Sequence, residues 1–285
     1  MGKLLILGPG TLGKRVGVQW SHSDTSEIAG VTRTNRAHAE LRRMGISPAT
    51  QASPETFSSV LICVPPTQSD DYVQLVKNTA RNWLNAATGS LVFTSSAGVY
   101  SDESAIIDEH SPLKSDGSNN DRSDVLINAE NAALDAGGIV IRLAGLYHSS
   151  RGAHSYYLKG VSADSDPATR INQIHYDDAA DLCFRALRSD PSKLPHSLFN
   201  GADGSPTRRG DIPTIAKEKG KLDGQLPNFL QPASDDGTAG VGKILSAERA
   251  RTVLGWSPSY SSFTDFMTKL GNGTASEFCE DDYKW

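Results

Sequence analysis

The stretch that decides the fold is Lys3-Leu4-Leu5-Ile6-Leu7-Gly8-Pro9-Gly10-Thr11-Leu12-Gly13, close to the start of the sequence. Its first half, from Lys3 to Leu7, is a short apolar run that ends at glycine and proline, the pattern of a buried parallel strand. The residues that follow, 11–20, are expected to form a helix. The three glycines, spaced G-x-G-x-x-G, therefore fall at a turn from a strand into a helix. This arrangement predicts an α/β fold that begins with a strand, a glycine turn and a helix.

The alternation of apolar strands and helices continues along most of the chain. Further strands are expected at 27–32, 59–64, 91–94, 138–143 and 197–200, and further helices at 37–44, 70–84, 125–134 and 177–187. The strands are apolar at almost every position, as in a sheet that helices cover on both faces. The order predicts an α/β fold with a doubly wound parallel sheet, the Rossmann type.

Two stretches rich in Gly, Ser and Pro, residues 148–168 and 201–242, interrupt this alternation. They predict a small, loop-rich C-terminal substrate lobe laid over the sheet. We therefore assign residues 1–202 to the nucleotide-binding core, with a lobe insertion at about 148–172, and residues 203–285 to the small C-terminal lobe and tail. The acidic tail from Glu277 to Trp285 is expected to be peripheral.

Composition excludes several classes of protein. The formal net charge of −5 argues against binding to nucleic acid or to an anionic membrane surface. The three cysteines, Cys63, Cys183 and Cys279, are far apart and form no C-x-x-C pair, so neither a disulfide framework nor a metal site is expected. No apolar run approaches the roughly 20 residues of a membrane span. We expect a cytoplasmic protein, or an organellar one if a transit peptide has been removed, and the sequence assigns no oligomeric state.

The glycine turn carries a specific prediction of ligand. Gly8 permits a tight turn, Gly10 lets the backbone approach a pyrophosphate, and Gly13 allows the helix to pack closely on the strand. The helix then begins at Thr11 and Leu12, whose backbone N–H groups can bind phosphate oxygens. The alternative is a glycine-rich turn without a ligand, but its position between strand and helix favours a bound dinucleotide.

The end of the second strand distinguishes the two nicotinamide dinucleotides. A site for NAD requires Asp or Glu about 20 residues after the glycines, to bind the ribose hydroxyls. This chain instead has Val31-Thr32-Arg33-Thr34-Asn35-Arg36, with no carboxylate and two guanidinium groups. Arg33 and Arg36 suit a 2′-phosphate, although arginines at such a position are often only solvated. We therefore predict NADP as the cofactor, with Thr32, Arg33 and Arg36 at its 2′-phosphate.

Two more segments follow apolar strands and complete the expected site. Val64-Pro65-Pro66 ends one strand, and Thr94-Ser95-Ser96 ends the next. Ligands of doubly wound folds bind at the carboxyl ends of the strands. We expect both segments to converge with Gly8, Gly10 and Gly13 around one cleft, and we include Val64, Pro65, Pro66, Thr94 and Ser95 among the cofactor-binding candidates.

Several motifs in order give the chain a family resemblance. It resembles the extended short-chain dehydrogenase/reductases, the relatives of nucleotide-sugar epimerases and dehydratases, and most of all their atypical members with shortened substrate lobes. The matching segments, besides the glycine turn, are Leu91-Val-Phe-Thr-Ser-Ser-Ala-Gly-Val-Tyr100, Asp108-Glu-His-Ser-Pro112, Arg142-Leu-Ala-Gly-Leu-Tyr147, Asn172-Gln-Ile-His-Tyr-Asp-Asp178 and Leu254-Gly-Trp-Ser-Pro258.

The resemblance implies a catalytic Ser, Tyr and Lys, of which this chain keeps only the first. Ser96 falls on the Ser position, whereas Arg122 and Leu126 fall on the Tyr and Lys positions of the Y-x-x-x-K helix. Arg stays protonated at any usable pH and Leu has no proton to transfer, so the family's proton transfer is not available. We expect a non-standard active site in which Ser96 and Tyr100 are the candidate acids.

Three hypotheses of function stay open at this point. The first is an NADP-dependent oxidoreductase, or epimerase-like enzyme, that acts on a small carbonyl or alcohol substrate; Arg122, Tyr147 and His148 are then candidate substrate-binding residues. The second is an inactive NADP-binding sensor or scaffold, and the third is a lyase or isomerase that uses the nucleotide structurally. His175 with Asp177 and Asp178 could suggest a metal, but a helix start capped by Asp explains them more simply, and no metal is predicted.

Overall fold

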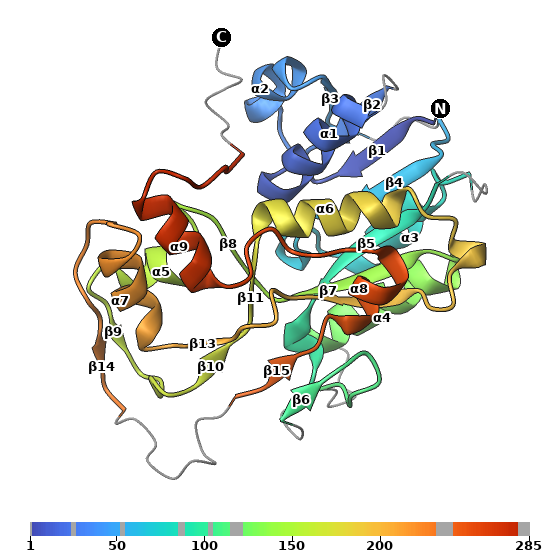
Figure 1. Ribbon diagram of the computed structural model, residues 1–285. Helices are drawn as coiled ribbons and strands as arrows, with labels where there is room; N and C mark the ends of the chain where they lie inside the picture. The colour runs from blue at the N-terminus through green and yellow to red at the C-terminus, as the bar shows by residue number, and fades with distance from the viewer. Residues whose placement is uncertain are drawn as a thin grey trace.

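The computed structural model describes residues 2–23, 27–51, 55–84, 89–101, 105–114, 122–231 and 242–278. Within these residues a seven-stranded sheet has the strand order β12-β7-β5-β4-β1-β2-β3, and all neighbouring strands are parallel (Figure 1). The doubly wound prediction is confirmed. The strands are β1 (Leu4–Leu7), β2 (Ile28–Val31), β3 (Ile46–Ala49), β4 (Ser59–Ile62), β5 (Leu91–Ser96), β7 (Ile139–Leu143) and β12 (Leu198–Gly201).

Helices cover both faces of the sheet, as its apolar strands require. On one face α1 (Thr11–Ser23) and α6 (Tyr176–Leu187) pack side by side, and on the other α3 (Tyr72–Ala80) packs against α4 (Arg122–Asp135) (Figure 1). Successive residues of β1 alternate between the two layers. Leu4 and Ile6 join the core under α1 and α6, whereas Leu5 and Leu7 join the core under α3 and α4. This period of two is what a strand buried on both faces must show.

The parallel register determines where the site lies. Leu7 of β1 pairs with Val31 of β2 and with Ile62 of β4, so three strands end at one edge of the sheet. The segments that follow them therefore leave the sheet next to one another, although they are far apart in sequence. This edge is the one at which doubly wound folds bind ligands.

One strand of the sheet was not predicted. β3 pairs with β2 at the edge of the sheet and contains Pro48, which the sequence favours as part of a loop. Proline lacks the N–H that a central strand needs, but an edge strand has one unpaired side that tolerates it. The helix expected at 37–44 is the short α2 (His38–Arg43), which follows a single 3₁₀ turn at Asn35–Ala37 and packs against β3.

The predicted loop-rich lobe has a small core of its own. Tyr147, Ile212, Phe263 and Phe266 are fully buried there against one another and their neighbours. Figure 1 shows this lobe to the left of the sheet. Its described elements are the helices α5 (Ala153–Tyr157), α7 (Asp211–Glu218) and α9 (Phe263–Gly271) and the short strands β8 (Gly145–Tyr147), β9 (Ser162–Ala163), β10 (Arg170–Ile171), β11 (Gln173–His175), β13 (Thr207–Arg208) and β14 (Asn228–Phe229).

The segment after residue 242 returns to the sheet. β15 (Ile244–Leu245) pairs with β6 (Ile106–Ile107), and α8 (Glu248–Leu254) packs on β12 and α6. Trp256 is 1% exposed in the core of the sheet, and its indole N–H donates to Asp178 O at 3.1 Å. Residues 244–256, which were assigned to the C-terminal lobe, therefore pack against the core that contains the sheet. Among the described residues, no helix is both long enough and apolar enough to cross a membrane.

Candidate functional site

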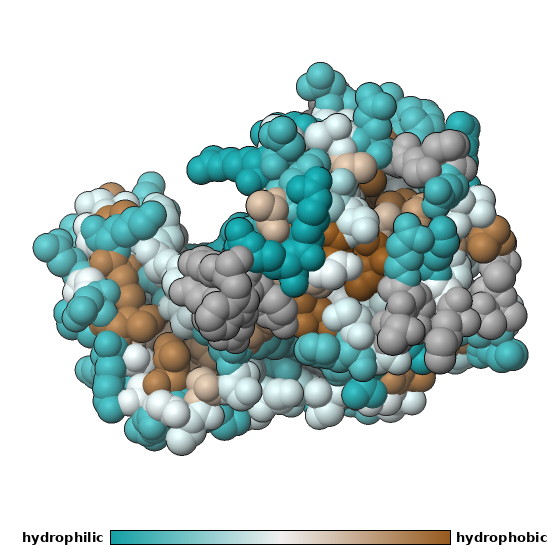
Figure 2. All heavy atoms as spheres, turned by 90° about the horizontal axis from the view of Figure 1, so that it is seen from above, coloured by the Kyte–Doolittle hydropathy of each residue, from teal (hydrophilic) through white to brown (hydrophobic). Residues whose placement is uncertain are grey.

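A cleft of about 860 Å³ lies at the carboxyl edge of the sheet. The segments after β1, β4 and β5 line it together, so the predicted convergence of these three segments is confirmed. In Figure 2 the surface is hollowed between the lobe on the left and the larger part of the molecule on the right. The lining residues that the sequence singled out are Gly8, Gly10, Thr11, Leu12, Thr32, Arg33, Val64, Pro65, Pro66, Thr94, Ser95, Ser96 and Arg122.

The glycine turn has the geometry expected of a phosphate loop. Gly8 has φ of +85°, and a Cβ there would lie 3.0 Å from Val64 Cα, so both the backbone conformation and the space require glycine. A Cβ on Gly13 would lie 3.0 Å from Gly8 O and from Ile6 Cγ2. Gly13 thus supports the loop from behind, where α1 packs on β1. The first N–H groups of α1, which have no partner within the helix, begin at the cleft.

A second cavity of about 410 Å³ adjoins the cleft at the end of β2. Thr32 and Arg33 line both cavities, and Arg36 lines the smaller one. The acid in this cavity, Glu40, is engaged by Lys14 Nζ at 2.7 Å. Among the described residues neither arginine has an ion-pair partner, so the smaller cavity presents two uncompensated guanidinium groups.

The other end of the cleft holds the two residues that stand where the resembled family has its catalytic Tyr and Lys. Arg122 and Leu126 are one turn apart on α4, and both line the cleft. Ser96 is partly exposed there, and its Oγ accepts a hydrogen bond from Gly98 N at 3.1 Å. Ser95 is 7% exposed, and no partner for its Oγ is found among the described residues. Ser96 and Arg122 thus line the same cleft.

Tyr100 does not reach the cleft, which corrects the prediction that it substitutes for the missing acid. Its side chain is fully buried, its hydroxyl donates to Asn200 Oδ1 at 2.8 Å, and its ring lies 4.7 Å from the Arg142 guanidinium. A hydroxyl enclosed in this way cannot contact a ligand. Tyr100 instead joins β7 and β12 beneath the site.

Tyr147 and His148, predicted to bind substrate, do not line the cleft either. Tyr147 is fully buried in the core of the lobe, where its ring packs at 5.1 Å from Phe263 and burial raises its pKa. His148 Nδ1 lies 3.6 Å from Glu277 Oε1, and burial lowers the pKa of its imidazole. Their neighbour in sequence, Leu146, is the residue that lines the cleft.

Two residues that the sequence did not single out line the cleft beside α1. These are Arg151 and Tyr176, and the Arg151 guanidinium lies 6.0 Å from the centre of the Tyr176 ring. The guanidinium of Arg15 lies 5.4 Å from the same ring and donates to Thr11 O at 3.0 Å. Tyr176 immediately precedes Asp177 and Asp178 in the sequence. No local sequence pattern, however, predicts that its ring contacts two arginines.

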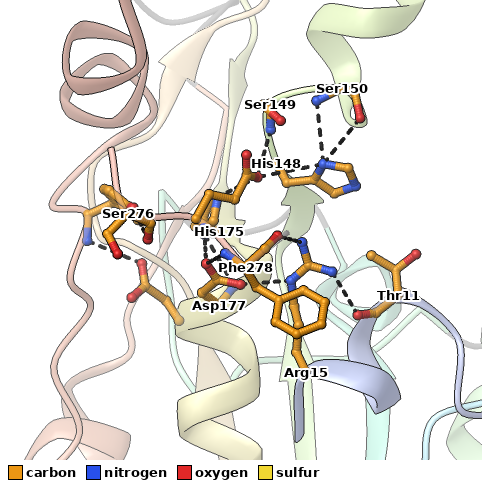
Figure 3. A network of polar contacts seen from close by, with 12 residues as sticks. Thr11, Arg15, His148, Ser149, Ser150, His175, Asp177, Ser276 and Phe278 are labelled. Carbon is orange, nitrogen blue, oxygen red and sulfur yellow. Dashed lines mark hydrogen bonds and ion pairs between the residues drawn. The ribbon is translucent and has the colours of Figure 1, made fainter. Parts of the chain in front are cut away.

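Phe278, in the tail that was expected to be peripheral, is packed against this region (Figure 3). Phe278 N donates to Asp177 Oδ2 at 3.0 Å, and Phe278 O accepts from Arg15 at 3.4 Å. Arg15 is 3% exposed and also binds Asp177 at 2.7 Å. One arginine therefore joins α1, α6 and the tail. The remaining residues of the tail, 279–285, lie outside the described residues.

Glu277 occupies a polar site next to this junction. It accepts from Ser149 N at 2.9 Å, and its Oε1 lies 3.3 Å from His175 Nε2. Burial acts to raise the pKa of Glu277, but the hydrogen bonds from His175 and Ser149 outweigh it and lower the pKa to about 2. Glu277 therefore brings a half-buried carboxylate into the space between the lobe and the core.

The residues that suggested a metal have structural contacts. His175 Nδ1 accepts from Asp177 N at 3.2 Å and so caps α6, a role that the sequence assigned to Asp. The Asp178 carboxylate accepts from Ser259 N at 2.6 Å and Tyr260 N at 3.2 Å. In the described part of the chain, no group of three or more His, Cys, Asp and Glu side chains could hold a metal ion.

Comparison with known proteins defines the fold. No protein-family model and no curated protein matches the chain. A functionally unknown conserved protein from Silicibacter pomeroyi is 21% identical with a TM-score of 0.74, covering 97% of this chain and 100% of its own. UDP-N-acetylglucosamine 4-epimerase from Bacillus cereus is 16% identical with a TM-score of 0.69, covering 96% and 99%.

A third solved structure is UDP-glucuronic acid 4-epimerase from Bacillus cereus in complex with NAD. It is 11% identical with a TM-score of 0.70, and the match covers 95% of this chain and 96% of that one. At these identities the likeness is one of fold, and it extends over nearly the whole chain. The protein therefore has the fold of the extended short-chain dehydrogenase/reductases, the fold of the UDP-sugar 4-epimerases.

Proposed function

We propose that the cleft binds NADP(H). The observation that carries this proposal is the continuity of two cavities, one at the glycine loop and one beside Arg33 and Arg36. A dinucleotide whose pyrophosphate lies at the start of α1 extends its adenosine ribose toward the end of β2. Two guanidinium groups without a described carboxylate partner favour a 2′-phosphate there over the free hydroxyls of NAD.

We further propose that the protein is an oxidoreductase for a small carbonyl or alcohol substrate. The glycine loop, Arg33 and Arg36 would hold NADPH, which would supply the hydride for the carbonyl carbon, and a protein hydroxyl would supply the proton for the carbonyl oxygen. Ser96 and Tyr176 are the hydroxyls that we assign to this proton, because both line the cleft. Burial raises the pKa of Tyr176, with Arg151 and Arg15 acting against it, so the phenol is protonated at neutral pH.

A second candidate function is an NADP-binding sensor or scaffold. Arg122 and Leu126, at the positions that the family resemblance gives to Tyr and Lys, both line the cleft and neither can act as an acid. A lyase or isomerase that keeps the nucleotide as a structural part is a third. Turnover separates the first two, because only an oxidoreductase consumes NADPH.

The cofactor proposal predicts that NADPH binds more tightly than NADH. Arg33→Ala is expected to weaken NADPH by ~1–3 kcal/mol, the scale of a charge-assisted contact, and to leave NADH nearly unchanged. Isothermal titration with both cofactors measures this. Arg42→Ala, an exposed arginine of α2 outside both cavities, is the control and should change neither affinity. Equal affinities of the unaltered protein for the two cofactors would refute the choice of NADP.

The proposed acids predict slow turnover that depends on a hydroxyl of the cleft. General acid catalysis contributes roughly 10² to 10⁴ in rate, so Ser96→Ala or Tyr176→Phe should lower NADPH oxidation within that range. The rate is measured with a panel of aldehydes, ketones and keto-sugars. Tyr100→Phe, which removes a hydroxyl outside the cleft, should leave kcat within about 3-fold when compared at equal folded protein. Tight NADPH binding without any turnover would favour the sensor.

A further inference from the structure

We propose that the substrate is an anion whose carboxylate or phosphate group binds Arg122. This inference rests on the proposed function, because the cofactor determines which part of the cleft is left for a substrate. It adds the chemical class of that substrate, which the fold and the glycine loop do not specify.

Arg122 lies too far from the 2′-phosphate pocket to belong to it. Arg33 follows β2, whereas Arg122 begins α4, which packs on β5 and β7. In the sheet β1 and β4 separate β2 from β5. Adjacent strands are ~4.8 Å apart, so β2 and β5 are roughly 14 Å apart. The guanidinium groups of Arg33 and Arg122 therefore serve different ends of the cleft.

The charges of the cleft favour an anionic ligand at both ends. Its described lining contains three arginines, Arg33, Arg122 and Arg151, and no Asp or Glu. The Arg151 guanidinium lies 6.0 Å from the centre of the Tyr176 ring, which the Arg15 guanidinium also approaches, at 5.4 Å. Arg33 is accounted for by the 2′-phosphate. Arg122 is exposed and has no acceptor among the described residues, so its guanidinium is available to an anionic group of a second ligand.

The apolar residues that line the cleft near Arg122 strengthen an ion pair between its guanidinium and a bound anion. Leu126, Leu143 and Ala144 line the same part of the cleft, so a bound ligand displaces water from apolar surface there. An ion pair in such surroundings is less screened than one on an open surface. Ser95 also lines the cleft, and no partner for its buried Oγ is found among the described residues. The site thus suits an oxyanion attached to a compact carbonyl compound.

Matched pairs of ligands test the proposal on the NADPH-loaded protein. Isothermal titration compares phenylpyruvate with its methyl ester, and dihydroxyacetone phosphate with dihydroxyacetone, so that the two pairs separate a carboxylate from a phosphate. In at least one pair the anion should bind about 10- to 100-fold more tightly, the range of a charge-assisted contact. Arg122→Gln should abolish this preference, and Arg122→Lys should keep part of it.

NADPH affinity serves as the internal control and should stay within about 2-fold in both Arg122 variants. Arg81→Gln, an exposed arginine just after α3 that does not line the cleft, is the matched variant and should keep the anion preference. The proposal is overturned if no anion of either pair is preferred by the loaded protein, or if the preference persists in Arg122→Gln. Failure of NADPH to bind the unaltered protein would instead refute the proposed function, and this inference with it.

Discussion

We expect Glu130→Ala to lower the free energy of unfolding by ~3–5 kcal/mol, the cost of leaving a buried charge without its partner. Glu130 of α4 and Arg142 of β7 are 1% and 4% exposed. Arg142 Nη2 lies 2.6 Å from Glu130 Oε2, and its Nε donates to both carboxylate oxygens at 3.1 Å. The same guanidinium lies under the Tyr100 ring. This pair fixes α4, and with it Arg122, to the sheet.

Urea unfolding at neutral pH measures this loss. Glu218→Ala, an exposed glutamate of α7, is the control and should stay within about 0.5 kcal/mol. A double variant, Glu130→Leu with Arg142→Met, removes both charges and should recover most of the loss, because apolar side chains of similar volume can replace a buried ion pair. A loss below about 1 kcal/mol in Glu130→Ala would contradict the assignment of Glu130 and Arg142 as a buried ion pair.

We expect Asp203→Asn to stabilise the protein increasingly as the pH rises. Asp203 is 4% exposed, and burial raises the pKa of its carboxyl to about 7. Its Oδ1 accepts from Ser205 N, whereas Oδ2 has no partner among the described residues. The folded protein therefore binds this proton more tightly than the unfolded chain does. The Asp203 carboxyl does not lower the free energy of unfolding below about pH 4, but it lowers it by about 2–4 kcal/mol above about pH 7.

The measurement is the difference in unfolding free energy between Asp203→Asn and the unaltered protein, taken from about pH 4 to about pH 8. Groups common to both proteins cancel in this difference, which isolates Asp203. Asp223→Asn, an exposed aspartate, is the control and should give a difference that hardly changes with pH. A flat difference for Asp203→Asn would show that its carboxyl is already ionised at about pH 5 in the folded protein.

The sequence predicted the parts of the fold that depend on local pattern. Each central strand is an apolar run, and each run ends at a glycine, proline or polar turn. β3 was missed because Pro48 is tolerated only through its place at the edge of the sheet, which is a tertiary property. The two-residue strands of the lobe were missed for the same reason, since pairings such as Arg170 with Arg208 join segments without any strand pattern of their own.

The residues of the candidate site also fall into those that local pattern predicts and those that only tertiary packing determines. Gly8, Gly10 and the segments after β4 and β5 could be placed because motif spacing and parallel register fix them. Tyr100 follows β5 in sequence, yet its side chain turns into the core, and only the three-dimensional structure shows this direction. Tyr176 was overlooked for the converse reason, because its place in the lining of the cleft depends on the packing of α6 against α1.

The junction of Arg15, Asp177 and Phe278 has a consequence for biosynthesis. Arg15 and Phe278 are separated by 263 positions, so the contact between them is among the most non-local that a chain of this length can form. Ribosomes add roughly 5–20 residues per second, and Phe278 therefore follows Arg15 by roughly 13–50 s. During that time the nascent chain has the glycine turn and α1 but not the tail that packs against them. We expect the junction to form only after Phe278 has been synthesised and has left the ribosome, and non-local closure of this kind is slow compared with local helix formation.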